Sequence, residues 1–182
     1  MKAMRQGTNM KVYTLYLFDL DGTLADMNSP VMYPDAQLWF DQYPAANWMV
    51  CTNQGGVGLR HWMETNGFGE PDQYPTEASI QERFRALFPA DKLDRILVAY
   101  AYQSKKSGQW SPTPYDARLD FSWEKAWRKP SPGMLTYAMQ LKHIAAGDTV
   151  MVGDSDEDEQ AADAAGCDFI RAWKFFGRDK PE

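Results

Sequence analysis

The chain has 182 residues, which is enough for one domain with a complete hydrophobic core. Its net charge of −6 argues against a broad basic surface for nucleic acid, and no apolar run approaches the roughly 18 residues of a membrane span. Two cysteines are too few for a disulfide scaffold or a four-cysteine metal site, so we expect reduced thiols in a cytoplasmic protein. Nothing in the sequence indicates an oligomeric state.

The predicted elements alternate along the chain. Residues 1–10 are expected to be a disordered N-terminal segment, and residues 11–182 a single domain. Apolar runs predict strands over residues 12–18, 47–51, 96–100, 149–152 and 168–171. Apolar stripes and capping residues predict helices over residues 34–43, 59–66, 76–88, 131–143 and 156–165.

This alternation predicts the fold class, an α/β protein with a Rossmann-like three-layer α/β/α sandwich around a mainly parallel sheet. Ligands of such sheets bind outside the carboxyl ends of the strands. An irregular, aromatic-rich loop is expected at about 103–127. Long loops of this kind are often functional, and the alternative is a loop packed onto the domain by its own aromatic side chains.

Two carboxylates stand directly after the first strand. Asp19 and Asp21 lie two positions apart and are followed by Gly22. Such a pair at a strand end is suited to a divalent cation, and one carboxylate can then act as a nucleophile. The alternative is an ordinary Asp-Gly turn.

Two further segments provide groups that suit a phosphate. Thr52, Asn53 and a Gly turn follow the second strand and offer a hydroxyl, an amide and free backbone N–H groups. Arg128 and Lys129 stand just before a predicted helix, where Lys129 is placed to neutralise a phosphoryl group. The alternatives are an ordinary helix cap and a solvated surface lysine.

An acidic segment follows the fourth strand. Asp154 at the strand end suits a third metal carboxylate, and Asp158 lies one helical turn further on, where it can pair with Lys129 or orient a metal-bound water. We interpret Asp156, Glu157 and Glu159 as favourable charge at a helix N-terminus. Asp19, Asp21 and the five acids within 154–159 explain the net charge, because the other 18 acidic residues nearly balance 19 basic ones.

Together these motifs resemble the haloacid dehalogenase (HAD) superfamily of phosphatases, subfamily III-like. The four motifs are Asp19-Leu20-Asp21-Gly22-Thr23, Thr52, Lys129, and Gly153-Asp154 with Asp158. They occur in the family's order, and the resemblance extends from Val12 to about Arg171. Only 30 residues separate Asp21 from Thr52, so we expect a capless or minimally capped enzyme.

The resemblance implies a Mg²⁺-dependent phosphomonoester hydrolase. Asp19 would form an aspartyl-phosphate, Asp21 would serve as general acid and then as general base, and Thr52 and Lys129 would hold the phosphoryl group. The implied metal residues are Asp19, Asp21 through its backbone carbonyl, Asp154 and Asp158. Asn53 and Arg128 are expected to bind the substrate.

The motifs look like the branch that contains histidinol phosphatase, heptose bisphosphate phosphatase and polynucleotide 3′-phosphatase. The first two usually carry Arg where this chain has Leu20, and they often carry a Cys/His zinc loop, whereas residues 103–127 contain neither residue type. Polynucleotide phosphatases place Arg at the position of Leu59, and here Arg60 lies one residue further on.

Three functions therefore remain open. The favoured one is hydrolysis of a small phosphorylated metabolite. The second is a polynucleotide 3′-phosphatase, since Lys105, Lys106, Trp110, Tyr115, Arg118 and Trp123 could clamp a base, although nucleic acid is not the favoured partner. The third is a non-catalytic phosphate-binding module, which the complete motif set disfavours.

Overall fold

The protein is described by a computed structural model for residues 11–181, so the expectation for residues 1–10 lies outside the described residues. Its centre is a five-stranded sheet in the order β3-β2-β1-β4-β5, in which every neighbouring pair is parallel. The strands are β1 (Leu15–Phe18), β2 (Trp48–Asn53), β3 (Ile96–Ala99), β4 (Thr149–Gly153) and β5 (Asp168–Arg171). The predicted parallel α/β fold is confirmed.

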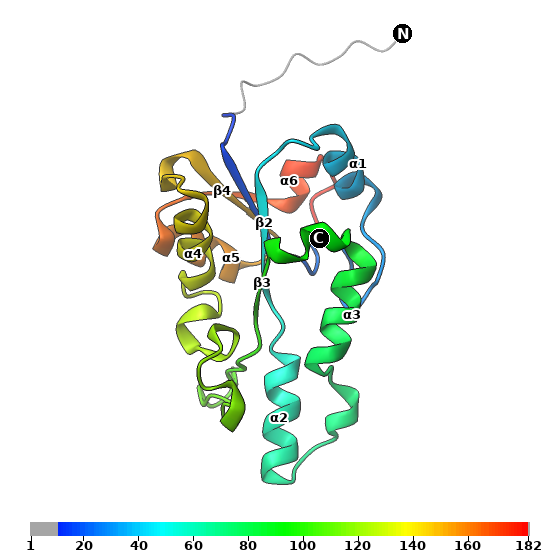
Figure 1. Ribbon diagram of the computed structural model, residues 1–182, viewed down its shortest axis with the longest axis vertical. Helices are drawn as coiled ribbons and strands as arrows, with labels where there is room; N and C mark the ends of the chain where they lie inside the picture. Colours follow the sequence, from blue (N-terminus) through cyan, green and yellow to red (C-terminus); the bar gives the residue numbers. More distant parts are fainter. Residues whose placement is uncertain (1–10, 182) are drawn as a thin grey trace.

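Helices cover both faces of the sheet (Figure 1). They are α1 (Pro34–Gln42), α2 (Gly56–Asn66), α3 (Glu77–Leu87), α4 (Gly133–Lys142), α5 (Asp156–Ala165) and α6 (Ala172–Phe176). Side chains of α4 and α5 pack with Leu15 and Leu17 of β1 in one core, whereas those of α1, α3 and α6 pack with Phe18 in the other. Alternate residues of β1 thus face opposite layers, as a strand buried on both faces requires.

Several predicted boundaries differ from the structure. β1 begins at Leu15 rather than Val12, whose side chain is exposed. α2 begins at Gly56, so the glycine turn expected before this helix is its first turn. α4 begins at Gly133 rather than at residue 131, and it ends at Lys142, one residue before the predicted end; His143 follows it in a left-handed conformation with φ of 55°. No helix was expected over α6, because five residues are too short to show a helical period.

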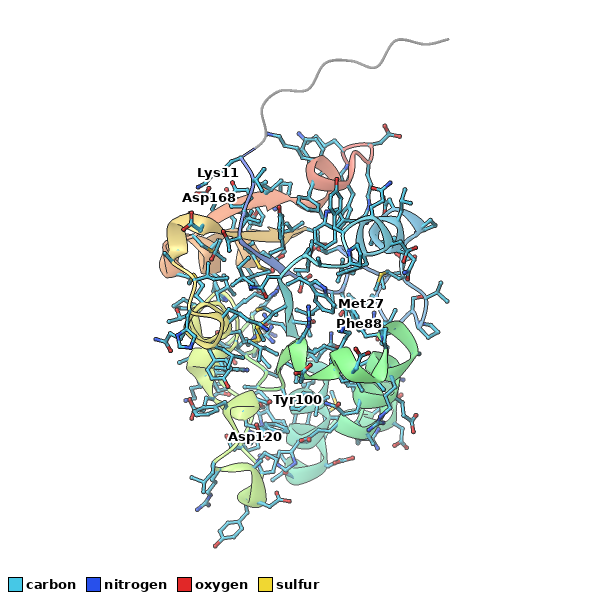
Figure 2. The ribbon with its side chains drawn as sticks, turned by 45° about the horizontal axis from the view of Figure 1, so that its top comes forward. Lys11, Met27, Phe88, Tyr100, Asp120 and Asp168 are labelled. Atoms are coloured by element: carbon cyan, nitrogen blue, oxygen red, sulfur yellow. The ribbon has the colours of Figure 1, made fainter. Side chains whose placement is uncertain are left out.

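The loop at 103–127 is tied to the domain by tryptophans. It contains three short 3₁₀ turns, and Trp123 and Trp127 are buried. Their indole N–H groups donate to Glu77 Oε1 and to the Val98 carbonyl, each at 3.0 Å. The loop also joins the end of β3 through Tyr100, whose N–H donates to the Ser122 carbonyl at 2.7 Å; Figure 2 labels Tyr100 and the loop residue Asp120.

None of the helices within residues 11–181 is both long enough and apolar enough to cross a membrane.

Candidate active site

The polar residues singled out in the sequence converge at the carboxyl edge of the sheet. Asp19 follows β1, Thr52 and Asn53 end β2, and Asp154 follows Gly153 at the end of β4. β1 lies between β2 and β4, so these three strand ends are neighbours. Parallel strands bring their carboxyl ends to one edge, which explains how residues more than 130 positions apart along the chain share a site.

Lys129 lies at the centre of this edge and is only 2% exposed. Its Nζ donates to Asp19 Oδ1 at 2.7 Å and to Asp158 Oδ1 at 2.5 Å. Its backbone is held by the Asn53 amide, which accepts from the Lys129 N–H at 3.0 Å and donates to the Lys129 carbonyl at 2.8 Å. Lys129 is therefore a buried, fixed cation and not a solvated surface lysine.

Three carboxylates lie together at this point, and the Lys129 ammonium contacts two of them, Asp19 and Asp158. Asp19, Asp154 and Asp158 each have an oxygen within 4.8 Å of the others, and we call them the acidic group. Two glycines allow this close packing. A Cβ on Gly22 would lie 2.1 Å from Asp154 Oδ2, and a Cβ on Gly153 would lie 2.4 Å from Asp158 Oδ2. Gly22 also has φ of 77°, a conformation that side chains disfavour.

Burial and crowding shift the pKa values in this group. Burial raises the pKa of Asp19 to about 7; the Lys129 ammonium opposes this effect, and the Asp158 and Asp154 carboxylates add to it. Burial also raises the pKa of Asp154, again with help from Asp158. Burial lowers the pKa of Lys129, but Asp19 and Asp158 outweigh it and raise the value overall, so the ammonium remains charged.

A divalent cation fits this arrangement. When ionised, three carboxylates carry one negative charge each, and the single Lys129 ammonium leaves two of these charges unbalanced. The donors are hard oxygens, which suit Mg²⁺ better than zinc. Asp158 has both oxygens engaged already, since Oδ2 accepts from the Ser155 N–H at 3.0 Å and from its hydroxyl at 2.8 Å. Asp19 and Asp154 are therefore the better candidates for direct ligands.

Comparison with known proteins agrees with this geometry. A family model described as HAD-hydrolase-like matches residues 126–171, which include Lys129, Asp154 and Asp158. Two solved structures, each with a TM-score of 0.54, are similar to the chain. One is a HAD-like phosphatase candidate from Mesorhizobium loti, 20% identical, with 90% of this chain and 74% of that chain covered.

The other is D,D-heptose 1,7-bisphosphate phosphatase from B. bronchiseptica, 22% identical, with 86% of this chain and 78% of that chain covered. The chain has the fold of the HAD-like hydrolases. Among curated proteins, none matches the sequence. The family resemblance that the four motifs predict is thus confirmed by the family model and by the fold.

The remaining residues expected in the HAD-like site take different positions. Thr52 is buried at the end of β2, and its hydroxyl accepts from Gln54 Nε2 at 3.0 Å. The Arg128 guanidinium lies beside Gly55, the N-cap of α2, and its Nη1 donates to the Ala101 carbonyl at 3.2 Å. The Asn53 amide is hydrogen-bonded to the Lys129 backbone, and its Nδ2 also donates to Glu157 Oε2 at 3.3 Å. Substrate contacts of Arg128 and Asn53 remain predictions.

Asp21 lies beside the acidic group but its side chain does not belong to it. Its Oδ1 accepts from Arg83 Nη2 at 2.7 Å, and its Oδ2 accepts from Gln54 Nε2 at 2.8 Å. Neither donor was expected to serve the site. A signal for Arg83 was present, because it interrupts the buried stripe of Ile80, Phe84 and Leu87 on α3, where a charged residue is unusual.

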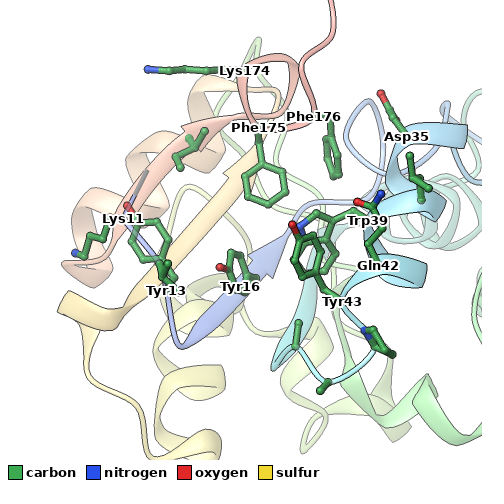
Figure 3. Close-up of a pocket in the computed structure, with 16 residues that line it drawn as sticks. Lys11, Tyr13, Tyr16, Asp35, Trp39, Gln42, Tyr43, Lys174, Phe175 and Phe176 are labelled. Carbon is green, nitrogen blue, oxygen red and sulfur yellow. The ribbon is translucent and has the colours of Figure 1, made fainter. Parts of the chain in front are cut away.

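A large cavity lies at the opposite edge of the sheet. It has a volume of about 1050 Å³ and is lined by α1, α6 and the segments that precede β1 and β2, together with Tyr16 of β1 and Ile170 of β5. Figure 3 shows aromatic side chains around it, and we call it the aromatic cavity; they are Tyr13, Tyr16, Trp39, Tyr43, Phe175 and Phe176. None of the acidic group lines it.

Proposed function

We propose that the chain is a Mg²⁺-dependent phosphomonoester hydrolase that works through an aspartyl-phosphate on Asp19. The observation that carries this proposal is the buried Lys129 ammonium, which contacts Asp19 at 2.7 Å and Asp158 at 2.5 Å while Asp154 completes the acidic group. Buried, mutually perturbed ionisable groups are typical of catalytic sites. Burying charged groups costs free energy, so fold stability alone is a weak reason for burying Lys129 with Asp19 and Asp158.

In the proposed reaction, an Asp19 carboxylate oxygen attacks the phosphorus of the ester. The bond from phosphorus to the leaving oxygen breaks, and that oxygen takes a proton from the Asp21 carboxyl. Water then attacks the aspartyl-phosphate and gives a proton to Asp21, which returns both aspartates to their starting states. The Lys129 ammonium and the Thr52 hydroxyl bind the transferred phosphoryl group.

Mg²⁺ would be held by the Asp19 carboxylate, the Asp21 backbone carbonyl and Asp154, and it would offset the charge of the substrate phosphate. We assign Asp158 to holding Lys129 and to orienting a metal-bound water. The heptose bisphosphate phosphatase of similar fold was crystallised with magnesium and phosphate, which supports the pairing of this fold with both. We propose a small phosphorylated metabolite as the substrate.

A polynucleotide 3′-phosphatase is the second candidate. The loop at 103–127 presents Tyr115, which is 82% exposed, with the Arg118 guanidinium 4.5 Å from its ring centre. Arg60, by contrast, is occupied within the domain. It pairs with Glu64 and Asp72, each at 2.9 Å, and donates to two backbone carbonyls, so it is less suited to contact a nucleotide.

The test is phosphate release from a panel of esters, with Mg²⁺ and again with a chelator. The panel holds sugar phosphates, histidinol phosphate, nucleotides and a 3′-phosphorylated oligonucleotide. We expect Mg²⁺-dependent turnover of one ester class, which is lost in Asp19→Asn. The matched control is Asp156→Asn, an exposed acid near the site that pairs with Arg171, and it should retain activity. A wild-type protein that is inactive on every ester would contradict the proposal, and a preference for the oligonucleotide would favour the second candidate.

A further inference from the structure

Arg83 is a charged residue in an apolar position. It lies on α3, is only 8% exposed, and shares the buried face of that helix with Ile80 and Phe84. Burying a guanidinium on such a face is costly unless its donors find partners. The contacts of Arg83 therefore indicate what the residue does there.

Those contacts join three points of one loop. Arg83 Nη2 donates to Asp21 Oδ1 at 2.7 Å and to the Asp26 carbonyl at 2.8 Å, while Nε donates to the Ser29 carbonyl at 2.8 Å. The loop between β1 and α1 is thereby fastened to α3. The Asp21 carboxylate is fixed on both sides, since its other oxygen accepts from Gln54.

Stability alone gives a weak reason for this arrangement. Arg83 Nη1 is buried and has no hydrogen-bond partner among the described residues. An unsatisfied buried donor costs free energy, and buried ion pairs seldom stabilise a fold more than well-packed apolar residues would. The arrangement does, however, leave the Asp21 carboxylate with a fixed orientation, which general acid–base catalysis needs.

We propose that Arg83 is a positioning residue that aims the Asp21 carboxyl at the leaving-group oxygen, an inference that rests on the proposed function. The carboxyl must give its proton as the bond to that oxygen breaks. Two donors from different elements, Arg83 on α3 and Gln54 after β2, hold the plane of this carboxyl. Each oxygen keeps a second lone pair for the proton, because each accepts a single hydrogen bond from these donors.

The test compares aryl phosphates whose leaving groups differ in their need for a proton. 4-Nitrophenyl phosphate releases a stable anion, whereas phenyl and 4-methoxyphenyl phosphate need more help from an acid. In Arg83→Gln, kcat/KM should fall about 100-fold for the two poorer leaving groups and less than about fivefold for 4-nitrophenyl phosphate. Hydrolysis of the aspartyl-phosphate should also slow, so 4-nitrophenolate should appear in a burst.

The matched control is Arg85→Gln, which changes an exposed arginine on the same helix. It should leave kcat/KM for all three aryl phosphates unchanged. Arg83→Lys keeps the positive charge but lacks the several N–H donors of a guanidinium, so kcat/KM for the two poorer leaving groups should recover in part. If Arg83→Gln does not fold, the same three esters are compared in Arg83→Lys. A uniform decrease across the three esters, or none, would overturn the role of Arg83 while the phosphatase stands. Absence of turnover in the wild type would overturn the proposed function itself, and with it this inference.

Discussion

The two edges of the sheet present opposite kinds of surface. At the carboxyl edge, three carboxylates and one ammonium crowd into a small volume around Lys129. At the amino edge, aromatic rings surround a cavity of about 1050 Å³. Cavity size alone would place the function in the aromatic cavity, because ligand sites are usually apolar pockets.

The free-energy cost of burying charged groups instead places the function at the carboxyl edge. Aromatic side chains gain free energy when they are partly buried, so the aromatic cavity needs no function to explain its residues. Buried ion pairs seldom stabilise a fold more than apolar residues would, so the buried contacts of Lys129 with Asp19 and Asp158 are hard to explain by stability alone. Buried charge is therefore a better guide to the site than cavity size, and two predictions test this contrast between the two edges.

The largest expected effect is at Lys129. Lys129→Met removes the ammonium that pairs with Asp19 and Asp158, so we expect activity to fall at least about 10³-fold and the free energy of unfolding to fall by about 3 kcal/mol. Phosphate release and urea denaturation measure the two. Lys174→Met is the matched control, because Lys174 is an exposed lysine that lines the aromatic cavity. If both variants behaved alike, the contrast between the two edges would be wrong.

A second prediction concerns the aromatic cavity. The Trp39 ring lies 5.2 Å from that of Tyr16 and 5.1 Å from that of Phe18, measured between centroids. Trp39→Ala should lower the free energy of unfolding by about 2–3 kcal/mol, because it removes a partly buried aromatic side chain. Activity of the folded fraction should stay within about threefold of the wild type, since Trp39 lines a cavity that no member of the acidic group lines.

The control for Trp39 is its neighbour Leu38, which is 54% exposed at the same cavity. Leu38→Ala should change the free energy of unfolding by less than about 0.5 kcal/mol. Thermal unfolding and steady-state kinetics distinguish the outcomes. A large loss of kcat in Trp39→Ala with unchanged stability would mean that the aromatic cavity takes part in catalysis.

The sequence was sufficient for the parts of the site that follow from strand ends. Asp19, Thr52 and Asp154 could be placed together because parallel strands share a carboxyl edge, and apolar runs locate such strands well. Lys129 was expected at the site for its place before a helix, but its complete burial depends on packing around it. The pairing of Asp158 with Lys129, one of two alternatives, is what the structure shows.

The residues of the site that the sequence did not predict, Arg83 and Arg178, depend on contacts between distant segments of the chain. Arg83 reaches Asp21 across 62 positions, and nothing in a helical period indicates which strand a helix will face. Arg178 lies beyond the region of family resemblance, yet its Nη2 donates to the Thr23 carbonyl at 2.8 Å, inside the first motif. Local patterns predict elements, whereas such side-chain partners follow from tertiary packing.

The smallest predicted effect concerns a second contact of Arg178, its pairing with Asp35 on α1. Arg178 forms two hydrogen bonds with Asp35, at 2.6 and 2.7 Å, and thereby holds the pKa of Asp35 below its ordinary value. A lowered pKa stabilises the folded state above the unfolded-state pKa of about 3.9, and the contribution is lost as pH falls through the folded-state value.

Asp35→Asn should therefore lower the free energy of unfolding by about 0.5 kcal/mol at pH 7, a small value because the pair is partly exposed to solvent. The difference from the wild type should shrink below about pH 4. Denaturation at pH 7 and pH 3 measures this difference. Asp41→Asn is the control on the same helix, because Asp41 accepts only from Gln37 among the described residues.

A difference that stayed constant with pH would show that Asp35 acts through helix capping, by accepting from the Ala36 N–H, and not through its charge. Because Arg178 also holds the Thr23 carbonyl, a fall in kcat that accompanied the loss of stability would extend the catalytic edge to the C-terminal segment.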